Sequence, residues 1–149
     1  MRAIKDIVID DEIFLLSTEE YIKYKSNIPL INAWWWLRSP GIRSCNAALV
    51  NNGGSVDDRG SSVSSDIFAA RPALRITKSA NLKIGDRFIK YDFPWIYIGD
   101  ELAIAEVPIA FRKFDSVSND YEHSRIRRFL LGWLKERKVK DNSECDGNN

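Results

Sequence analysis

The residues that could do chemistry in this chain are few and scattered. His123 is the single histidine, and no serine, cysteine or aspartate arrangement around it forms a nucleophile and base. Cys45 lies in a polar stretch and Cys145 in an Asn/Asp/Gly-rich end, so neither position suggests a disulfide. Asp57 and Asp58 offer two carboxylates, whereas a calcium site needs more oxygen ligands. We therefore expect a non-enzymatic protein with no catalytic residues, no metal and no cofactor.

Length, composition and charge indicate one domain. The 149 residues are 44% hydrophobic and 11% aromatic, enough apolar area for one core. The 22 basic and 21 acidic side chains give no overall attraction to nucleic acid or anionic lipid. No run is apolar enough for a membrane helix, and acids occupy the place of a signal peptide's apolar run. We expect one cytoplasmic domain at residues 1–140, without membrane contact, and a disordered tail at 141–149.

Short elements with clear boundaries begin the chain. Runs of β-branched and aromatic residues at 4–9 and 12–17 predict two strands. Ser17 is followed three residues later by Glu20, which is the pattern of a capping box at a helix start. The sequence therefore predicts a short helix through about Lys25.

An apolar block at 33–37 precedes a long polar stretch. Three of its five residues are tryptophan, and it must be buried on at least one face, because each packed aromatic side chain buries roughly 150–250 Å². From residue 39 to 70 Gly, Ser, Asn and Asp dominate, with single apolar residues marking very short strands. We expect a long irregular loop region at 42–68, followed by a strand at 71–76.

The second half predicts a meander and a long helix. Closely spaced apolar segments at 87–91, 94–99 and 101–107 are typical of antiparallel strands. A helix is expected from Ser118 onward, with a stripe of apolar residues at helical spacing: Ile126, Phe129, Leu130, Trp133 and Leu134. Together the elements indicate an α+β fold.

Two motifs resemble a known domain family. They are WWLRSPG at 35–41 and RPAL at 71–74, with Ala47, Val50, Gly54, Val56 and Val63 between them. They resemble the closing half of an uncharacterised domain family of gut Firmicutes and their phages, similar to C-type-lectin-like and formylglycine-generating-enzyme folds. The resemblance implies a C-type-lectin-like mixed or antiparallel sheet with two helices.

The activities known for those folds are not implied for this chain. Formylglycine-generating enzymes depend on a reactive cysteine pair, and neither Cys45 nor Cys145 stands in a matching context. The Glu-Pro-Asn and Trp-Asn-Asp patterns of calcium-dependent lectins do not occur. We expect neither activity.

The halves of the family pattern occur in swapped order. The closing half is at residues 1–76, and the meander with the SNDYEHSRIRRFL phrase, which resembles the opening half, is at 82–137. One interpretation is a circularly permuted domain, which we prefer because surface linkers tolerate such joins. The other is a domain-swapped homodimer in which two chains complete each other.

The 42–68 region has a restricted alphabet. Proteins with this frame often resemble the variable proteins of diversity-generating retroelements, where randomised Asn codons ending in a pyrimidine cannot encode Lys, Glu, Gln, Met or Trp. None of those five types occurs from residue 39 to 70. Turn geometry alone also favours such a composition, so both explanations stay open. Under either one we expect ligand contacts from Arg43, Ser44, Asn46, Asn51, Asn52, Asp57, Asp58, Arg59, Ser62, Ser64, Asp66 and Phe68.

Four residues of the motifs are expected to form a structural frame. Trp35 and Trp36 would supply buried aromatic area, and Arg38 and Arg71 would bind loop carbonyls and a carboxylate such as Glu122. The alternative is that the two arginines bind the ligand directly, as a clamp. The leading hypothesis is a binding module that displays residues 42–68 to an unidentified protein or small molecule.

A second hypothesis concerns the basic helix at 118–140. Residues 112–140 hold nine Lys and Arg against four Asp and Glu, and the apolar stripe leaves this charge on the outer face. Such a face could contact nucleic acid, although solvated helix faces are often equally basic. The alternative function is a phage-encoded effector that inhibits a host protein or nucleoprotein through this helix.

Overall fold

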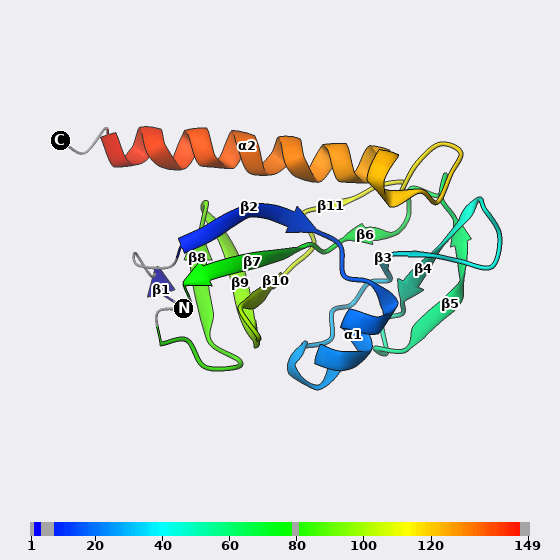
Figure 1. The fold of residues 1–149 in the computed structure, drawn as a ribbon, viewed down its shortest axis with the longest axis horizontal. Coiled ribbons are helices and arrows are strands. Elements are labelled where there is room, and N and C mark those ends of the chain that lie inside the picture. Colours follow the sequence, from blue (N-terminus) through cyan, green and yellow to red (C-terminus); the bar gives the residue numbers. More distant parts are fainter. Residues whose placement is uncertain (1, 4–7, 79–80, 147–149) are drawn as a thin grey trace.

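Two β-sheets lie between two α-helices in the computed structural model, which describes residues 2–3, 8–78 and 81–146 (Figure 1). The larger sheet has the order β1 (Arg2–Ala3), β8 (Arg87–Lys90), β9 (Phe93–Gly99), β10 (Leu102–Ala105), β7 (Ala73–Lys78), β2 (Val8–Phe14). The smaller sheet has the order β11 (Ala110–Phe111), β6 (Ala69–Ala70), β3 (Trp35–Pro40), β4 (Asn46–Val50), β5 (Val56–Ser62). Neighbouring strands are antiparallel except for the parallel pairs β1 with β8 and β3 with β6. The predicted α+β class, with mixed sheets and two helices, is confirmed.

Side chains of both sheets alternate between two hydrophobic clusters, since successive residues of a strand point to opposite faces. One cluster, the α2 core, joins Trp36 of β3 to Ile126 and Leu130 of helix α2 (Arg125–Asp146). The other, the α1 core, joins Trp35 to Tyr21 of helix α1 (Thr18–Tyr24). The adjacent residues Trp35 and Trp36 are therefore both buried, one in each cluster.

The two halves of the family pattern build common sheets within one chain. In the larger sheet β2 and β7, from residues 1–76, lie beside the meander of β8, β9 and β10. In the smaller sheet β11 from the second half pairs with β6 from the first. Neither half therefore has a sheet of its own.

Helix α1 begins as the capping box predicts. The Ser17 side chain accepts a hydrogen bond from the Glu20 amide, and the Glu20 carboxylate accepts one from the Ser17 amide at 2.8 Å. A 3-10 turn, Lys25–Asn27, follows the helix. The predicted end near Lys25 is confirmed.

Helix α2 begins later and ends later than the sequence suggested. Ser124 is its N-terminal cap, because the Ser124 hydroxyl accepts from the Arg127 amide at 3.1 Å. Residues 118–123 instead form a loop and a 3-10 turn, Tyr121–His123. The structure assigns residues 141–146, where the sequence suggested the start of a tail at 141–149, to the end of α2. Residues 147–149 lie outside the described residues.

Residues 42–68 are more regular than the predicted loop region. They contain the antiparallel hairpin of β4 and β5, and the side chains of residues 47–50 are fully buried. The polar strand β5 has no apolar alternation, and its pairing with buried β4 determines its conformation. The parts of this region outside strands are the connection at 42–45, the hairpin turn at 51–55 and the connection at 63–68.

The other predicted strands are found with shifted boundaries. The three strands of the meander are confirmed as β8, β9 and β10. The segments expected at 4–9 and 12–17 correspond to the single strand β2, which has an irregular register between Ile9 and Ile13; residues 4–7 lie outside the described residues. Within the described ranges, no helix has the length and apolar character needed to cross a membrane.

Candidate functional site

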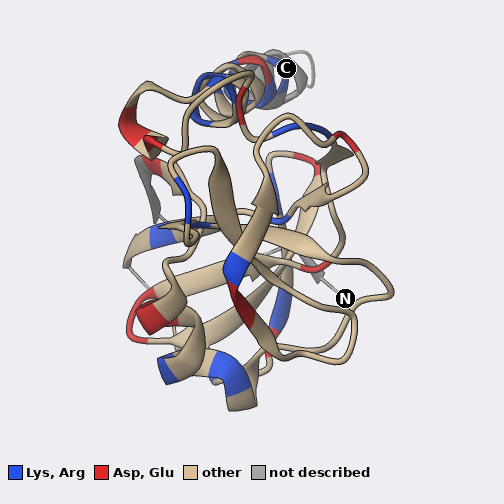
Figure 2. Ribbon diagram, turned by 90° about the vertical axis from the view of Figure 1, so that its right-hand side faces the viewer, with Lys and Arg blue, Asp and Glu red and all other residues tan. Residues whose placement is uncertain are grey.

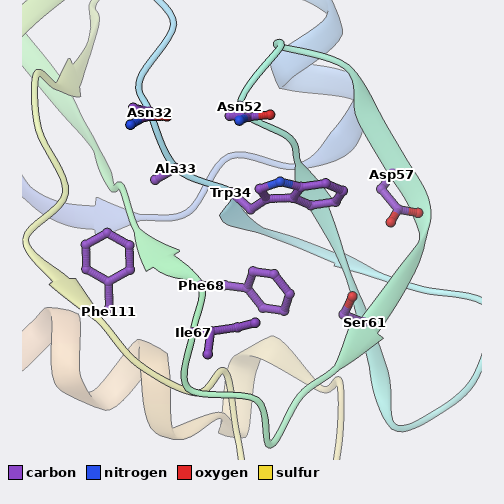
Figure 3. A pocket seen from close by; sticks show the side chains of 9 residues that line it. All are labelled: Asn32, Ala33, Trp34, Asn52, Asp57, Ser61, Ile67, Phe68 and Phe111. Atoms are coloured by element: carbon purple, nitrogen blue, oxygen red, sulfur yellow. The ribbon is translucent and has the colours of Figure 1, made fainter.

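A shallow hollow of about 560 Å³ lies on the smaller sheet, beside the β4–β5 hairpin (Figure 3). We call it the apolar hollow. It is formed by the segment before β3, by the hairpin, by the segment that leads into β6, and by β11. Its lining residues are Asn32, Ala33, Trp34, Asn52, Asp57, Ser61, Ile67, Phe68 and Phe111.

Trp34 forms part of the hollow because it lies just before strand β3. The next two residues, Trp35 and Trp36, begin that strand, and their side chains are buried on its two opposite faces. Trp35 and Trp36 are almost completely buried, whereas Trp34 is 38% exposed. The Trp34 carbonyl accepts a hydrogen bond of 2.9 Å from the Ala69 amide, so its backbone is tied to β6. Its indole is thus presented to solvent on a backbone that is held in place.

Phe68 lies next to Trp34 and connects the hollow to the α2 core. The two rings are 6.3 Å apart between centroids and tilted by 40°. The Phe68 ring also meets Trp36 edge to face at 5.1 Å. Because Trp36 is fully buried, Phe68 is supported from below and forms a rigid part of the hollow.

Ile67 and Phe111 extend the apolar surface out to solvent. Their side chains are 69% and 59% exposed. Phe111 pairs with Ala69 in β11 and β6, so it has a defined position at the sheet edge. Large apolar side chains gathered around a hollow, instead of scattered singly, are typical of an interaction surface.

The hairpin supplies the polar side of the hollow. Asn52 lies in its turn, and Asp57 and Ser61 lie on β5 (Figure 3). An Asp57 carboxylate oxygen accepts from the Gly60 amide at 3.2 Å, which orients that side chain. The hollow therefore combines an apolar floor with a small number of oriented polar groups, as ligand sites do.

Close backbone packing fixes the hairpin against its neighbours. Gly60 has φ of +80°, and a Cβ there would lie 2.3 Å from the Ala47 carbonyl oxygen. A Cβ on Gly41 would lie 2.3 Å from the Arg59 carbonyl oxygen. The Tyr21 hydroxyl donates to the Gly54 carbonyl at 2.7 Å, which joins the hairpin turn to α1.

Of the twelve predicted ligand residues, the structure brings three to the hollow: Asn52, Asp57 and Phe68. Asn51 instead stabilises the turn, since its side-chain oxygen accepts from the amides of Gly53 and Ser55. Arg43, Ser44 and Asn46 lie where the chain meets Asn119, which hydrogen-bonds their backbone carbonyls. The others are outside the lining: Asp58, Arg59, Ser62, Ser64 and Asp66.

The four frame residues make mainly internal contacts. Arg71 is 1% exposed, donates to the carbonyls of Ala105 at 2.8 Å and Pro29 at 2.9 Å, and stacks on Trp35. Burial lowers the pKa of Arg71 to about 10, so the group is still charged at neutral pH. Arg38 donates to the Leu15 carbonyl and to the carboxylate of Glu20. The suggested partner Glu122 was wrong, because Glu122 lies near Arg127 at 3.9 Å.

The residues considered for chemistry do not converge. The His123 ring nitrogen is 2.7 Å from an Asp120 carboxylate oxygen, and both side chains are exposed. Cys45 is an exposed free thiol. In the described part of the chain, His, Cys, Asp and Glu form no group of three or more that could hold a metal ion.

Sequence reasoning missed most of the hollow. Asn32, Ala33, Trp34, Ser61, Ile67 and Phe111 come from segments that meet only in the folded chain. Two signals were available in the sequence. In a run of three tryptophans, two can be buried on the two faces of a strand, which leaves a third for another role. Ile67 and Phe68 form an apolar pair within a polar stretch.

Comparison with protein-family models, with curated proteins and with solved structures finds no match for this chain.

Proposed function

We propose that this protein is a non-enzymatic recognition module that binds an apolar side chain of a protein partner in the apolar hollow. The observation that carries the proposal is the half-exposed indole of Trp34, supported by Phe68 and bordered by the exposed side chains of Ile67 and Phe111. Leaving such area in water is unfavourable by about 25 cal/mol per Å². A partner that covers it would recover that free energy.

The composition of the surface favours a protein partner. Interface centres are enriched in aromatic residues and depleted of charge. The hollow has three aromatic side chains, and Asp57 is its only charged residue among those that line it. In Figure 2 tan ribbon predominates, and blue segments lie on the helix at the top, on the short helix at the bottom and singly on the elements between them.

The position of the hollow supports the role expected for the 42–68 region. Asn52, Asp57, Ser61, Ile67 and Phe68 all belong to that region and reach the hollow from a paired hairpin or from its connection to β6. Side chains displayed on a fixed backbone change the ligand preference without changing the fold. This arrangement suits the variable-protein resemblance, which we retain as part of the proposal.

We also propose that the chain acts as a permuted monomer. The support is that both halves complete the same two sheets within one chain. Light scattering should give the mass of one chain at every concentration. A concentration-dependent dimer would favour the swapped arrangement.

Photo-crosslinking tests the hollow directly. A crosslinking residue is introduced as Ile67→p-benzoylphenylalanine, with Ile22→p-benzoylphenylalanine as the matched control, because Ile22 is 61% exposed on α1 and does not line the hollow. In lysate of the source organism, position 67 should give a discrete adduct that position 22 does not give. Excess wild-type protein should compete for it.

A competitor variant makes the test specific to the hollow. Phe111→Ser should retain the wild-type melting temperature, because its side chain is exposed, but should compete about tenfold less well. Equal competition by wild type and Phe111→Ser would contradict the proposal. Adducts of the same identity from positions 67 and 22 would do so as well.

A further inference from the structure

A second hollow, of about 420 Å³, is lined by Arg112, Arg125, Arg128 and Phe129. Arg112 follows β11 directly, and the other three residues form the first turns of α2. None of these residues lines the apolar hollow. We call this second site the arginine hollow.

The Arg112 side chain is held in place before any ligand arrives. Its guanidinium carbon lies 4.1 Å from the centroid of the Phe129 ring, a stacking distance. Its amide donates to the Phe68 carbonyl at 2.9 Å, and its carbonyl accepts from the Trp36 indole at 2.9 Å. The backbone on both sides of Arg112 is thus fixed, and a guanidinium positioned in this way loses little entropy on binding.

The three guanidinium groups have no carboxylate partner among the described residues. Ion pairs are found close by, for Arg127 with Glu122 and for Arg137 with Asp92, but none includes Arg112, Arg125 or Arg128. The buried Nε of Arg112 also has no hydrogen-bond partner in the described structure. Three guanidinium groups that line one hollow without a carboxylate partner are typical of a place where an anion binds.

Asp115 is an acid close to the cluster, because it accepts from the Arg125 amide, but its oxygens bond backbone amides and form no ion pair with the three arginines in the described structure. Asp115 accepts hydrogen bonds from the backbone amides of Val117, Ser118 and Arg125. The pKa of Arg112 is lowered, first by burial and then by the positive charge of Arg125. Two cations that destabilise one another would both be stabilised by an anion placed between them.

We propose that the arginine hollow binds a phosphoryl group. Planar guanidinium donors from two separate elements match a tetrahedral, multiply charged anion, which offers more acceptor oxygens than one carboxylate does. The helix dipole adds partial positive charge at the start of α2, where the first amides already donate to Asp115, Phe114 and Ser124. A small phosphorylated ligand and a phosphodiester backbone both carry such a group, and the experiment distinguishes these two sources.

The test uses two probes and a matched pair of variants. Binding of pyrophosphate and of a short single-stranded oligonucleotide is measured by calorimetry on the full chain. Arg125→Gln combined with Arg128→Gln removes two exposed arginines from the hollow. Each single variant is also measured, and Arg127→Gln is the matched control for one arginine, because it removes one positive charge from the same helix turn but does not line the hollow.

We expect the double variant to weaken binding by about tenfold for each arginine and the control to change it by less than about twofold. Binding of pyrophosphate alone identifies a small phosphorylated ligand. Tighter binding of the oligonucleotide, with a steep dependence on salt, identifies a phosphodiester backbone. Equal losses in Arg127→Gln and the double variant, or no binding of either probe at millimolar concentration, would overturn the proposal.

Discussion

The indole nitrogen of Trp36 donates a hydrogen bond of 2.9 Å to the carbonyl oxygen of Arg112. Trp36, a buried residue of β3, thereby fixes the position of a segment whose two consecutive residues line two different hollows. Phe111 lines the apolar hollow, and Arg112 lines the arginine hollow. Trp36 also contacts Phe68, so it supports both proposed sites from the core.

The first and last tryptophans of the run at 34–36 should differ sharply in their effect on stability. Trp36→Ala removes a fully buried ring and should lower the free energy of unfolding by about 3–5 kcal/mol. Trp34→Ala removes a half-exposed ring and should cost less than about 2 kcal/mol. Urea denaturation measures both. Similar losses would mean that Trp34 belongs to the core and not to a surface site.

Alanine substitutions at two glycines with positive φ should also differ in how much they destabilise the protein. Gly60→Ala should destabilise by at least about 3 kcal/mol, because the strained backbone adds to a clash with the Ala47 carbonyl. Gly85→Ala has φ of +92° but open space around the new Cβ, so only the strain of about 1–2 kcal/mol should appear. Thermal melting compares them. Equal shifts would show that β4 and β5 are not packed as closely as described.

The contribution of Glu20 should disappear in acid. Burial raises the pKa of Glu20, but hydrogen bonds from Arg38 and Ser17 outweigh it, and the net pKa is below its ordinary value. The unfolded chain therefore binds more protons as the pH falls, and the stability from Glu20 is present at neutral pH and lost through the acid range. Glu20→Gln should cost about 1 kcal/mol at neutral pH, and this cost should shrink as the pH falls below the ordinary glutamate pKa and through the lowered pKa of the folded state.

Melting temperatures of wild type and Glu20→Gln across this range test the sign of that dependence. The control is Glu19→Gln, an exposed neighbour on the same turn of α1. A gap between wild type and Glu20→Gln that widens in acid would contradict the assignment.

The middle of α2 offers a stabilising substitution. Gly132 is exposed within the helix, and a Cβ added there meets no atom within 4 Å. Gly132→Ala should therefore raise the free energy of unfolding by about 0.5–1 kcal/mol through lower entropy of the unfolded chain. Urea denaturation provides the measurement. A loss of stability would indicate that this face of α2 is covered in solution.

Local patterns predicted the elements whose determinants are local. The capping box of Ser17 and Glu20 predicted the start of α1, and the apolar stripe of Ile126, Leu130 and Leu134 predicted the face of α2 that enters the core. The start of α2 was misplaced because several hydroxyl and acidic residues compete as caps, and the fold selects Ser124. A very short strand was expected near Val56, and the full length of β5 was missed because its conformation depends on pairing with β4.

The apolar hollow depends on contacts between distant segments. Trp34, Phe68 and Phe111 are brought together by the parallel pairing of β3 with β6 and the antiparallel pairing of β6 with β11. Neither pairing could be predicted from a turn sequence, because both join segments that are separated by more than thirty residues. Three predicted residues reach the hollow: Asn52 and Asp57 from the hairpin and Phe68 from the connection to β6.

The close approach of Gly41 and Gly60 to neighbouring carbonyls divides the hairpin into positions that tolerate replacement and positions that do not. A designed library on this backbone would randomise Asn52, Asp57, Ser61 and Ile67 and keep both glycines. The two glycines maintain the close backbone packing. Side chains at the randomised positions could therefore be chosen only for their shape and charge complementarity to a ligand. The hairpin could therefore serve as a scaffold for engineered binders.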